Sequence, residues 1–303
     1  RMRQDTDSVA RTREIEEFTN LHVIHPVSIR LTRWLARLRV SPNTVSFTGM
    51  LCGVLAGVAY YHYRALPWAV AGFCLMVAWH VLDGADGQLA RLTNSQSEFG
   101  KVIDGICDYV TFIAVYLGLG FALQHQFGAA VWAVIVVAGL CHAVQSAAYE
   151  AQRQEYNFWG YDKQSAELPR VADLEAMKDH GPLAQRLLNR LHILYVRMQY
   201  MGAGVTIKGR EELAAKLRRE PAQAALIRRL YRETFAPSVR RWALLSANYR
   251  TLAIFICAML NVPLLYFMLE TFALSLVMIV LVGRQRAHCE EFLRTLAAAD
   301  RLS

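Results

Sequence analysis

The chain has 303 residues, 54% of them hydrophobic, with a mean hydropathy of +0.21. This is too apolar for an ordinary soluble domain, and its long apolar runs predict several membrane-spanning helices. The net charge is +8, which membrane proteins reach by keeping Lys and Arg on the cytoplasmic side, so we expect no nucleic-acid partner. The six cysteines lie mostly in apolar runs without paired spacing, which argues against disulfides and zinc ligation. The first 20 residues are polar and charged, so we expect no cleavable signal peptide.

Residues 1–43 are expected to form an N-terminal cytoplasmic segment. Residues 1–25 are mostly polar and predict a surface segment, and a helix is expected from Pro26. Its apolar positions recur at helical spacing: Val27, Leu31, Trp34, Leu35 and Leu38. Arginines occupy another face, so the pattern favours an amphipathic interfacial helix on an anionic membrane surface over a helix packed on a soluble domain.

Six membrane-spanning helices are predicted. Residues 44–150 hold the first four, at about 44–61, 68–91, 102–123 and from 128 past 149. Residues 241–303 hold the fifth and sixth spans and a C-terminal tail. Asn261-Val262-Pro263 and Glu270-Thr271 both interrupt the last apolar run, so the turn between these two spans is not fixed. The fold class is therefore all-α and polytopic.

Residues 151–240 form a polar insert that is too charged to span a membrane. We expect helices, such as one over 183–200, between its prolines. The insert could be a cytoplasmic cap or partner surface, but solvated helices on the membrane are the favoured interpretation. With six spans, every Lys and Arg except Arg64 falls on one side of the membrane. The positive-inside rule makes that side cytoplasmic, and a bacterial inner membrane is expected.

Four aspartates stand at the ends of the second and third spans. Asp83 and Asp86 are three residues apart and Asp104 and Asp108 four apart, so each pair shares one face of a helix. The two helices are antiparallel and joined by a short loop, which brings the pairs together. Carboxylates at membrane depth need a compensating charge. Their oxygens suit Mg²⁺ or Mn²⁺, and two ions could bridge a pyrophosphate and stabilise displacement at phosphorus.

The same residues resemble the signature of a known family. The pattern D-x2-D-G-x2-A-R-x8-G-x3-D-x3-D of the CDP-alcohol phosphotransferases (CDP-alcohol phosphatidyltransferases) is matched without departure. The matching positions are Asp83, Asp86, Gly87, Ala90, Arg91, Gly100, Asp104 and Asp108. The resemblance covers about residues 26–150 and, loosely, 241–290, but not the insert.

The resemblance implies roles by position. Asp83, Asp86, Asp104 and Asp108 would hold the metal ions, and Asp108 would also be the general base. The CDP site would be lined by Asn43, Gly87, Ala90, Arg91 and Gly100. The enzyme would be a metal-dependent phospholipid-synthesising transferase that passes a phospho-alcohol group from a CDP-alcohol to a hydroxyl acceptor and releases CMP.

The acceptor is less well defined by the sequence. His142, Gln145 and Arg153 share one polar face of the fourth helix, and they could bind the acceptor or make helix-packing hydrogen bonds. Arg250 could hold a phosphate. The favoured donor is CDP-diacylglycerol, with a polyol or polyol phosphate as acceptor. However, the run 91–95 also looks like the loop of members that transfer phosphocholine or phosphoethanolamine from CDP-choline or CDP-ethanolamine to a lipid alcohol.

Three other classes of protein fit the sequence less well. A membrane polyprenyl transferase would need more spans, and a cation transporter would need more charges deep in other spans than Glu270. A non-catalytic membrane scaffold has no need of four intact acids. The expected partners are a CDP-linked lipid or alcohol, a hydroxyl acceptor and membrane lipids, and a homodimer is left open.

Overall fold

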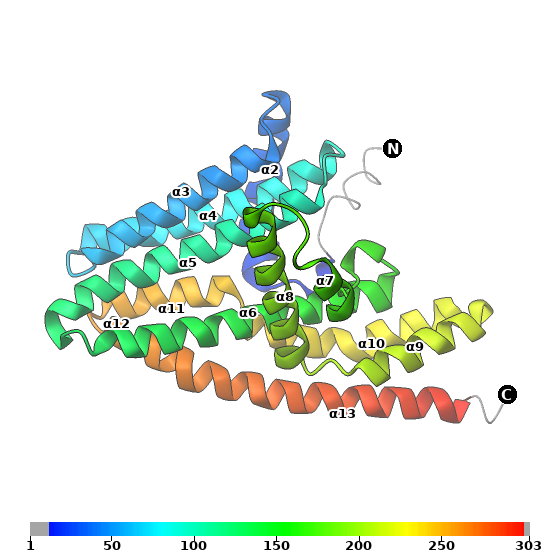
Figure 1. Cartoon of the computed structure of the whole chain (residues 1–303). Coiled ribbons are helices and arrows are strands. Elements are labelled where there is room, and N and C mark those ends of the chain that lie inside the picture. The colour runs from blue at the N-terminus through cyan, green and yellow to red at the C-terminus, as the bar shows by residue number, and fades with distance from the viewer. Residues whose placement is uncertain (1–11, 300–303) are drawn as a thin grey trace. The chain divides into compact units, whose positions relative to one another are not determined.

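The computed structural model describes residues 12–299, apart from the side chains of residues 13, 98, 99, 101, 102 and 299. This part of the chain is helical and contains no β-strand (Figure 1). It divides into two compact units: the described residues up to 139 together with 247–271, and residues 140–246 together with the described residues from 272 onward. The division predicted from the sequence (1–43, 44–150, 151–240 and 241–303) follows membrane topology, which this compactness does not test. It therefore stays a prediction, and residues 1–11 and 300–303 lie outside the described part.

The first unit begins with a short 3₁₀ helix, η1 (Arg13–Ile15), and a π-helical turn, η2 (Asn20–Ile24), which continues into α2 (His25–Arg37). Long helices follow: α3 (Pro42–Tyr61), α4 (Leu66–Leu92) and α5 (Glu98–Phe127). Then come the start of α6 (Val131–Tyr161), α11 (Ala247–Met259), α12 (Pro263–Met268) and the π-helical η6 (Leu269–Leu274), which runs across the end of this unit.

Local sequence sets where these helices begin. The Ser41 hydroxyl accepts a hydrogen bond from the Thr44 amide at the start of α3, and Pro42 occupies the first turn. In the same way, the Ser97 hydroxyl accepts from the Gly100 amide at the start of α5. The turn between the last two spans, left open by the sequence, lies at residues 260–262, where Asn261 has a φ of 58°.

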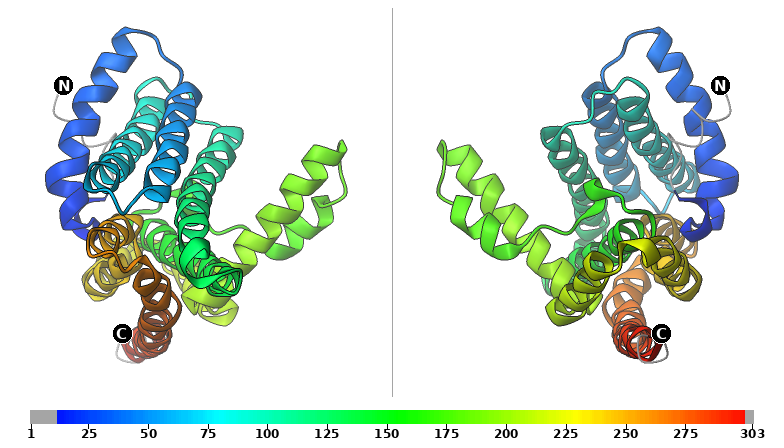
Figure 2. Two further views of the ribbon diagram at one scale, coloured as in Figure 1. Left: turned by 90° about the vertical axis from the view of Figure 1, so that its left-hand side faces the viewer. Right: turned by 90° about the vertical axis from the view of Figure 1, so that its right-hand side faces the viewer.

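Helix α3 packs on both α4 and α5, and the three run side by side (Figures 1 and 2). Glycine makes the contact with α5 possible: a Cβ on Gly118 would overlap the carbonyl oxygen of Gly57, and one on Gly53 would overlap the side chain of Thr111. Small residues allow such close approach where there is no water to drive helices together. The outer side of α3 exposes Phe47, Leu51 and Leu55.

The second unit is built from the rest of α6, η3 (Gln164–Ala166), α7 (Val171–Met177), α8 (Leu183–Ala203) and α9 (Ile207–Arg219). It continues with η4 (Pro221–Gln223), α10 (Ala224–Trp242), η5 (Ala243–Leu245) and α13 (Ser275–Ala299). Trp242 is fully buried in one of its cores, with Ala148, Leu245 and Leu281.

Six stretches of the described residues are long and apolar enough to cross a membrane, as predicted. They are 42–61, 66–92, 103–127, 131–161, 221–259 and 263–298. The all-α polytopic fold is thereby confirmed, and it fits an integral membrane protein. The helix predicted from Pro26 is present as α2, but its place on a membrane surface stays a prediction.

One expectation was wrong. The polar segment before Pro26 does not simply lie on the surface, because Ile15, Glu16 and Glu17 are buried in the first unit. The charges of this segment suggested exposure. Hydrogen bonds from Asn20 and from Asn248, on a helix distant in sequence, compensate the loss of hydration of the buried Glu16 and Glu17.

Candidate active site

The aspartates predicted to form two pairs come from the end of α4 and the start of α5, which the turn at residues 93–97 joins. Carboxylate oxygens of Asp83, Asp104 and Asp108 all lie within 4.8 Å of one another. The spacing argument thus succeeds for these three residues, since each helix turns its acidic face toward the other.

Asp86 has a different environment. Only 4% of it is exposed, and its Oδ2 accepts a hydrogen bond of 2.5 Å from the hydroxyl of Ser46 on α3. A hydrogen bond to an ionised carboxylate is among the stronger kinds. Ser46 was missed by the sequence interpretation. The available signal was its place one helical turn after Pro42, on the helix that also carries Asn43.

The acidic cluster concentrates negative charge. Asp83, Asp104 and Asp86 all add to the negative potential at Asp108. Moreover, Oδ1 of Asp108 is buried and has no hydrogen-bond partner among the residues that the structure describes. Carboxylates this close repel unless a cation lies between them. The oxygen-only donor set and the unpaired oxygen of Asp108 suit a hard divalent cation such as Mg²⁺ or Mn²⁺.

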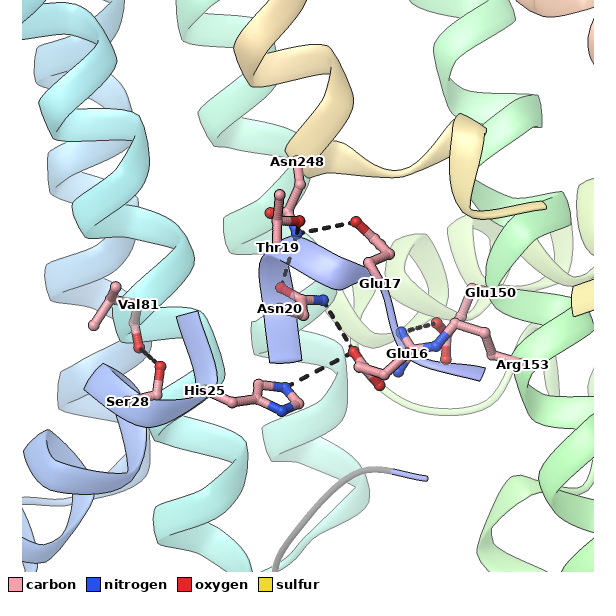
Figure 3. Close-up of polar contacts among 10 residues, drawn as sticks. All are labelled: Glu16, Glu17, Thr19, Asn20, His25, Ser28, Val81, Glu150, Arg153 and Asn248. Atoms are coloured by element: carbon pink, nitrogen blue, oxygen red, sulfur yellow. Dashed lines mark hydrogen bonds and ion pairs between the residues drawn. The ribbon is translucent and has the colours of Figure 1, made fainter. Parts of the chain in front are cut away.

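Helix α2 forms hydrogen bonds with the end of α4 that carries Asp83 and Asp86. The Ser28 hydroxyl donates a hydrogen bond of 2.8 Å to the carbonyl of Val81 (Figure 3), and the Thr32 hydroxyl lies 3.2 Å from the carbonyl of Ala85. A Cβ on Gly84 would lie 2.9 Å from Oγ of Ser28, so the glycine makes room for this contact. These bonds hold the backbone on both sides of Asp83.

Helix α11 holds α4 from another direction. Nε2 of His80, three residues before Asp83, lies 2.9 Å from the hydroxyl of Thr251, and both residues are buried. The contact gives His80 a structural function at the end of α4 that carries the aspartates.

The same helix binds the N-terminal segment. The side-chain amide of Asn248 donates to Glu17 Oε2 at 3.1 Å and to Asn20 Oδ1 at 2.8 Å (Figure 3). Asn20 in turn donates to Glu16 Oε1, which lies 3.8 Å from Nε2 of His25. This network compensates the burial of the two glutamates and fixes the start of α2.

The residues predicted to bind CDP lie at the same ends of α3, α4 and α5. Asn43 faces Gly100, since its Oδ1 lies 3.8 Å from the position of a Cβ on that glycine. The guanidinium of Arg91 folds back along α4, with Nη1 3.6 Å from a Cβ position on Gly87. Ala90 is half-buried on the same helix. The CDP-binding role of these five residues stays a prediction.

The residues predicted to bind the acceptor are divided between the two units. His142, Gln145 and Arg153 belong to the second, where Gln145 donates to the Ser275 hydroxyl at 3.1 Å and Arg153 pairs with Glu150 at 3.2 Å. Arg250 belongs to the first unit, where it is 1% exposed and pairs with Glu270 at 3.1 Å. These contacts give each of the three a structural function beside the predicted one, and His142 is buried.

Comparison with known proteins places these observations in a family. Residues 39–170 match the family model described as CDP-alcohol phosphatidyltransferase. A CDP-diacylglycerol–serine O-phosphatidyltransferase of Helicobacter pylori is 34% identical over 106 residues, 34% of this chain and 43% of that protein. An archaetidylinositol phosphate synthase of Pyrococcus horikoshii is 32% identical over 90 residues, 30% of this chain and 46% of that protein.

A cholinephosphotransferase 1 of Xenopus laevis is 32% identical over 95 residues, 28% of this chain and 24% of that protein. The chain thus spans less than half the length of each of these three relatives. The matched segment of 39–170 contains all eight positions of the motif. Residues 39–170 thus match a CDP-alcohol phosphatidyltransferase domain, which is the family that the aspartate motif predicted.

Proposed function

We propose that this protein is a metal-dependent CDP-alcohol phosphotransferase, which moves a phospho-alcohol group from a CDP-alcohol to a hydroxyl acceptor and releases CMP. The observation that carries this proposal is the cluster of Asp83, Asp104 and Asp108, whose oxygens lie within 4.8 Å of one another. The acids come from an intact family motif, and a non-catalytic scaffold would have no use for them.

Asp83, Asp104 and Asp108 would hold one divalent ion. Asp86, whose carboxylate accepts a hydrogen bond from Ser46, would help to hold a second. Bound Mg²⁺ or Mn²⁺ would supply positive charge that stabilises the phosphate oxygens during transfer. The burial and hydrogen bond of Asp86 keep its carboxylate in one orientation, which a metal ligand needs.

Asp108 is proposed as the general base. Its carboxylate would take the proton of the acceptor hydroxyl, whose oxygen bonds to the phosphorus that carries the alcohol. The bond between that phosphorus and the oxygen of CMP breaks, and CMP leaves with its electron pair. The guanidinium of Arg91 would hold phosphate oxygens of the CDP group. Asn43 and Gly100, which face each other, would border the nucleotide together with Gly87 and Ala90.

The favoured donor is CDP-diacylglycerol, and the favoured acceptor is a polyol or a polyol phosphate. The similarity to a CDP-diacylglycerol–serine O-phosphatidyltransferase supports this donor. His142, Gln145, Arg153 and Arg250 remain the candidates for binding the acceptor. The Lys and Arg distribution supports a site on the cytoplasmic side of the membrane, and a bacterial inner membrane remains the expected location.

A second candidate is transfer of phosphocholine or phosphoethanolamine from its CDP derivative to a lipid alcohol. The similarity to a cholinephosphotransferase and the run Arg91-Leu92-Thr93-Asn94-Ser95 favour it. The two candidates differ in which substrate brings the lipid, so donors and acceptors can be tested separately.

The test is release of CMP by the purified protein. CDP-diacylglycerol is supplied with polyols and polyol phosphates, and CDP-choline or CDP-ethanolamine with diacylglycerol, each with Mn²⁺, Mg²⁺ or a chelator. We expect release that requires metal and is lost in Asp108→Asn, whereas the control Asp173→Asn, at an exposed position on α7, keeps it. Full activity of Asp108→Asn, or release in chelator, would overturn the mechanism. Release from the aminoalcohol donors alone would select the second candidate.

A further inference from the structure

Helix α8 in the second unit carries an apolar stripe that faces solvent. The side chains of this stripe are more than half exposed: Leu183, Leu187, Leu191, Leu194 and Met201. At 100° per residue they fall within an arc of about 80° along some 27 Å of helix. A contiguous exposed stripe of this length marks a binding surface.

The rest of α8 is occupied by contacts within its own unit. Ile193, Val196 and Gln199 are buried on the side away from the stripe. Beside the stripe, Arg190 pairs with Asp179 at 3.0 Å and Arg197 pairs with Glu175 of α7, although both arginines stay more than half exposed. The α7–α8 hairpin is therefore held together by its own ion pairs, which leave the leucines uncovered.

The end of α8 lies where two spanning helices leave the apolar region. A Cβ on Gly202 would lie 3.0 Å from Ala148 of α6, and one on Gly204 would lie 2.9 Å from Val282 of α13. Directly after these positions the two helices become charged, with Glu150 in α6 and Arg284 in α13. The C-terminal end of α8 is therefore attached at the boundary between apolar and charged surface.

From this boundary α8 runs across the direction of α6 and α13 and away from them (Figures 1 and 2). Because spanning helices stand roughly along the membrane normal, a helix that crosses them at their polar ends lies roughly in the plane of the membrane surface. This is the orientation in which a one-sided apolar stripe enters the boundary of lipid head groups and acyl chains.

We propose that α8 is an interfacial helix whose stripe from Leu183 to Met201 inserts into the lipid surface next to the spans. Arg186, Arg190 and Arg197 lie along one edge of the stripe, where they would meet lipid phosphates. The charge arrangement favours lipid over an antiparallel second copy of α8, since antiparallel pairing of two such stripes would bring their rows of arginine close together. The proposal does not depend on the reaction catalysed.

The test compares two positions on α8 that are two residues apart and therefore about 200° apart around the helix. A nitroxide is attached at Leu187→Cys, in the stripe, or at Gln185→Cys, exposed on the other side, with the six native cysteines replaced. The full chain is reconstituted in vesicles of phosphatidylglycerol and phosphatidylethanolamine. Accessibility to oxygen and to a water-soluble nickel complex is then measured by electron paramagnetic resonance.

We expect the label at 187 to be several-fold more accessible to oxygen than to nickel, and the label at 185 to show the reverse. Equal access to nickel at both positions would overturn the proposal. Spin–spin broadening at 187 that vanishes on dilution with unlabelled protein would overturn it in favour of contact between copies. If the cysteine-free chain does not fold, a photoreactive benzophenone amino acid at 187 or 185 of the otherwise unchanged chain decides the same question. Crosslinks to lipid only from 187 support the proposal, and crosslinks to protein or none at all refute it.

Discussion

Oγ of Ser46 on α3 lies 2.5 Å from Oδ2 of Asp86 on α4, and both residues are buried. The bond crosses 40 residues of sequence and links α3, which carries Asn43 in its first turn, to the first half of the aspartate motif. This hydrogen bond restrains Asp86, which lies next to the cluster of three carboxylates. Removing the bond should therefore affect the site more than the stability of the fold.

We predict that Ser46→Ala raises the Mn²⁺ concentration needed for half-maximal CMP release about tenfold, which is typical of removing a partner that orients a metal ligand. The measurement is the metal dependence of the initial rate. The matched control is Thr48→Ala on the same helix, which removes an exposed hydroxyl bonded to the carbonyl of Thr44. An equal change in both variants would mean that α3 as a whole, and not the bond to Asp86, is responsible.

Mutual repulsion in the acidic cluster predicts an effect on stability. Without metal, and at a pH where all four acids are ionised, Asp108→Asn should raise the melting temperature, because it removes one negative charge that lies beside three others. With metal, the wild type should gain about 2.7 kcal/mol at a hundredfold excess over Kd, whereas the variant should gain much less. Thermal unfolding with and without Mn²⁺ measures both effects. A variant that melts below the wild type in chelator would show that the cluster is not strained by its charge.

The buried pair of Arg250 and Glu270 predicts a different pattern. Nε of Arg250 donates to both oxygens of Glu270, and the Tyr266 hydroxyl donates to Oε2 at 2.8 Å. Glu270→Gln should cost about 3 kcal/mol, because it leaves a buried guanidinium without its counter-charge. The double variant Arg250→Met/Glu270→Leu should recover most of this loss. The midpoint of thermal unfolding in detergent is the measurement, and a double variant less stable than the single one would contradict the argument.

Close packing of α3 on α5 makes Gly118 sensitive to a single methyl group. Gly118→Ala would force its Cβ into the carbonyl of Gly57, so we expect a destabilisation of about 2 kcal/mol from overpacking. Gly105→Ala on the same helix is the control, since a Cβ there would meet no described atom within 4 Å. Thermal unfolding should separate the two variants. If Gly105→Ala keeps its stability but loses CMP release, the space beside Asp104 is needed for substrate. Equal stability of both variants would refute the packing argument.

The sequence by itself determined the class of fold and predicted the acidic cluster of the candidate site. Lipid offers no hydrogen bonds to the backbone, so a continuous apolar run of about 20 residues crosses a bilayer as a helix, which pairs its own backbone groups. The six spans therefore followed from the apolar runs of the sequence. The helical period placed Asp83 opposite Asp104 and Asp108, because the loop between their helices is too short for another arrangement. These conclusions depend on residues close together in the chain.

Only the tertiary structure decided which distant residues support that site. Ser46 holds Asp86, Thr251 holds His80, and Glu270 holds the arginine for which the sequence suggested an acceptor phosphate. The local sequence around a serine, threonine or glutamate in an apolar run does not show which residue will be its hydrogen-bond partner. That partner depends on which helices pack together. The same reason explains why Glu16 and Glu17 were expected at the surface: their burial depends on Asn20 and Asn248, and Asn248 comes beside them only when α11 is folded into the first unit.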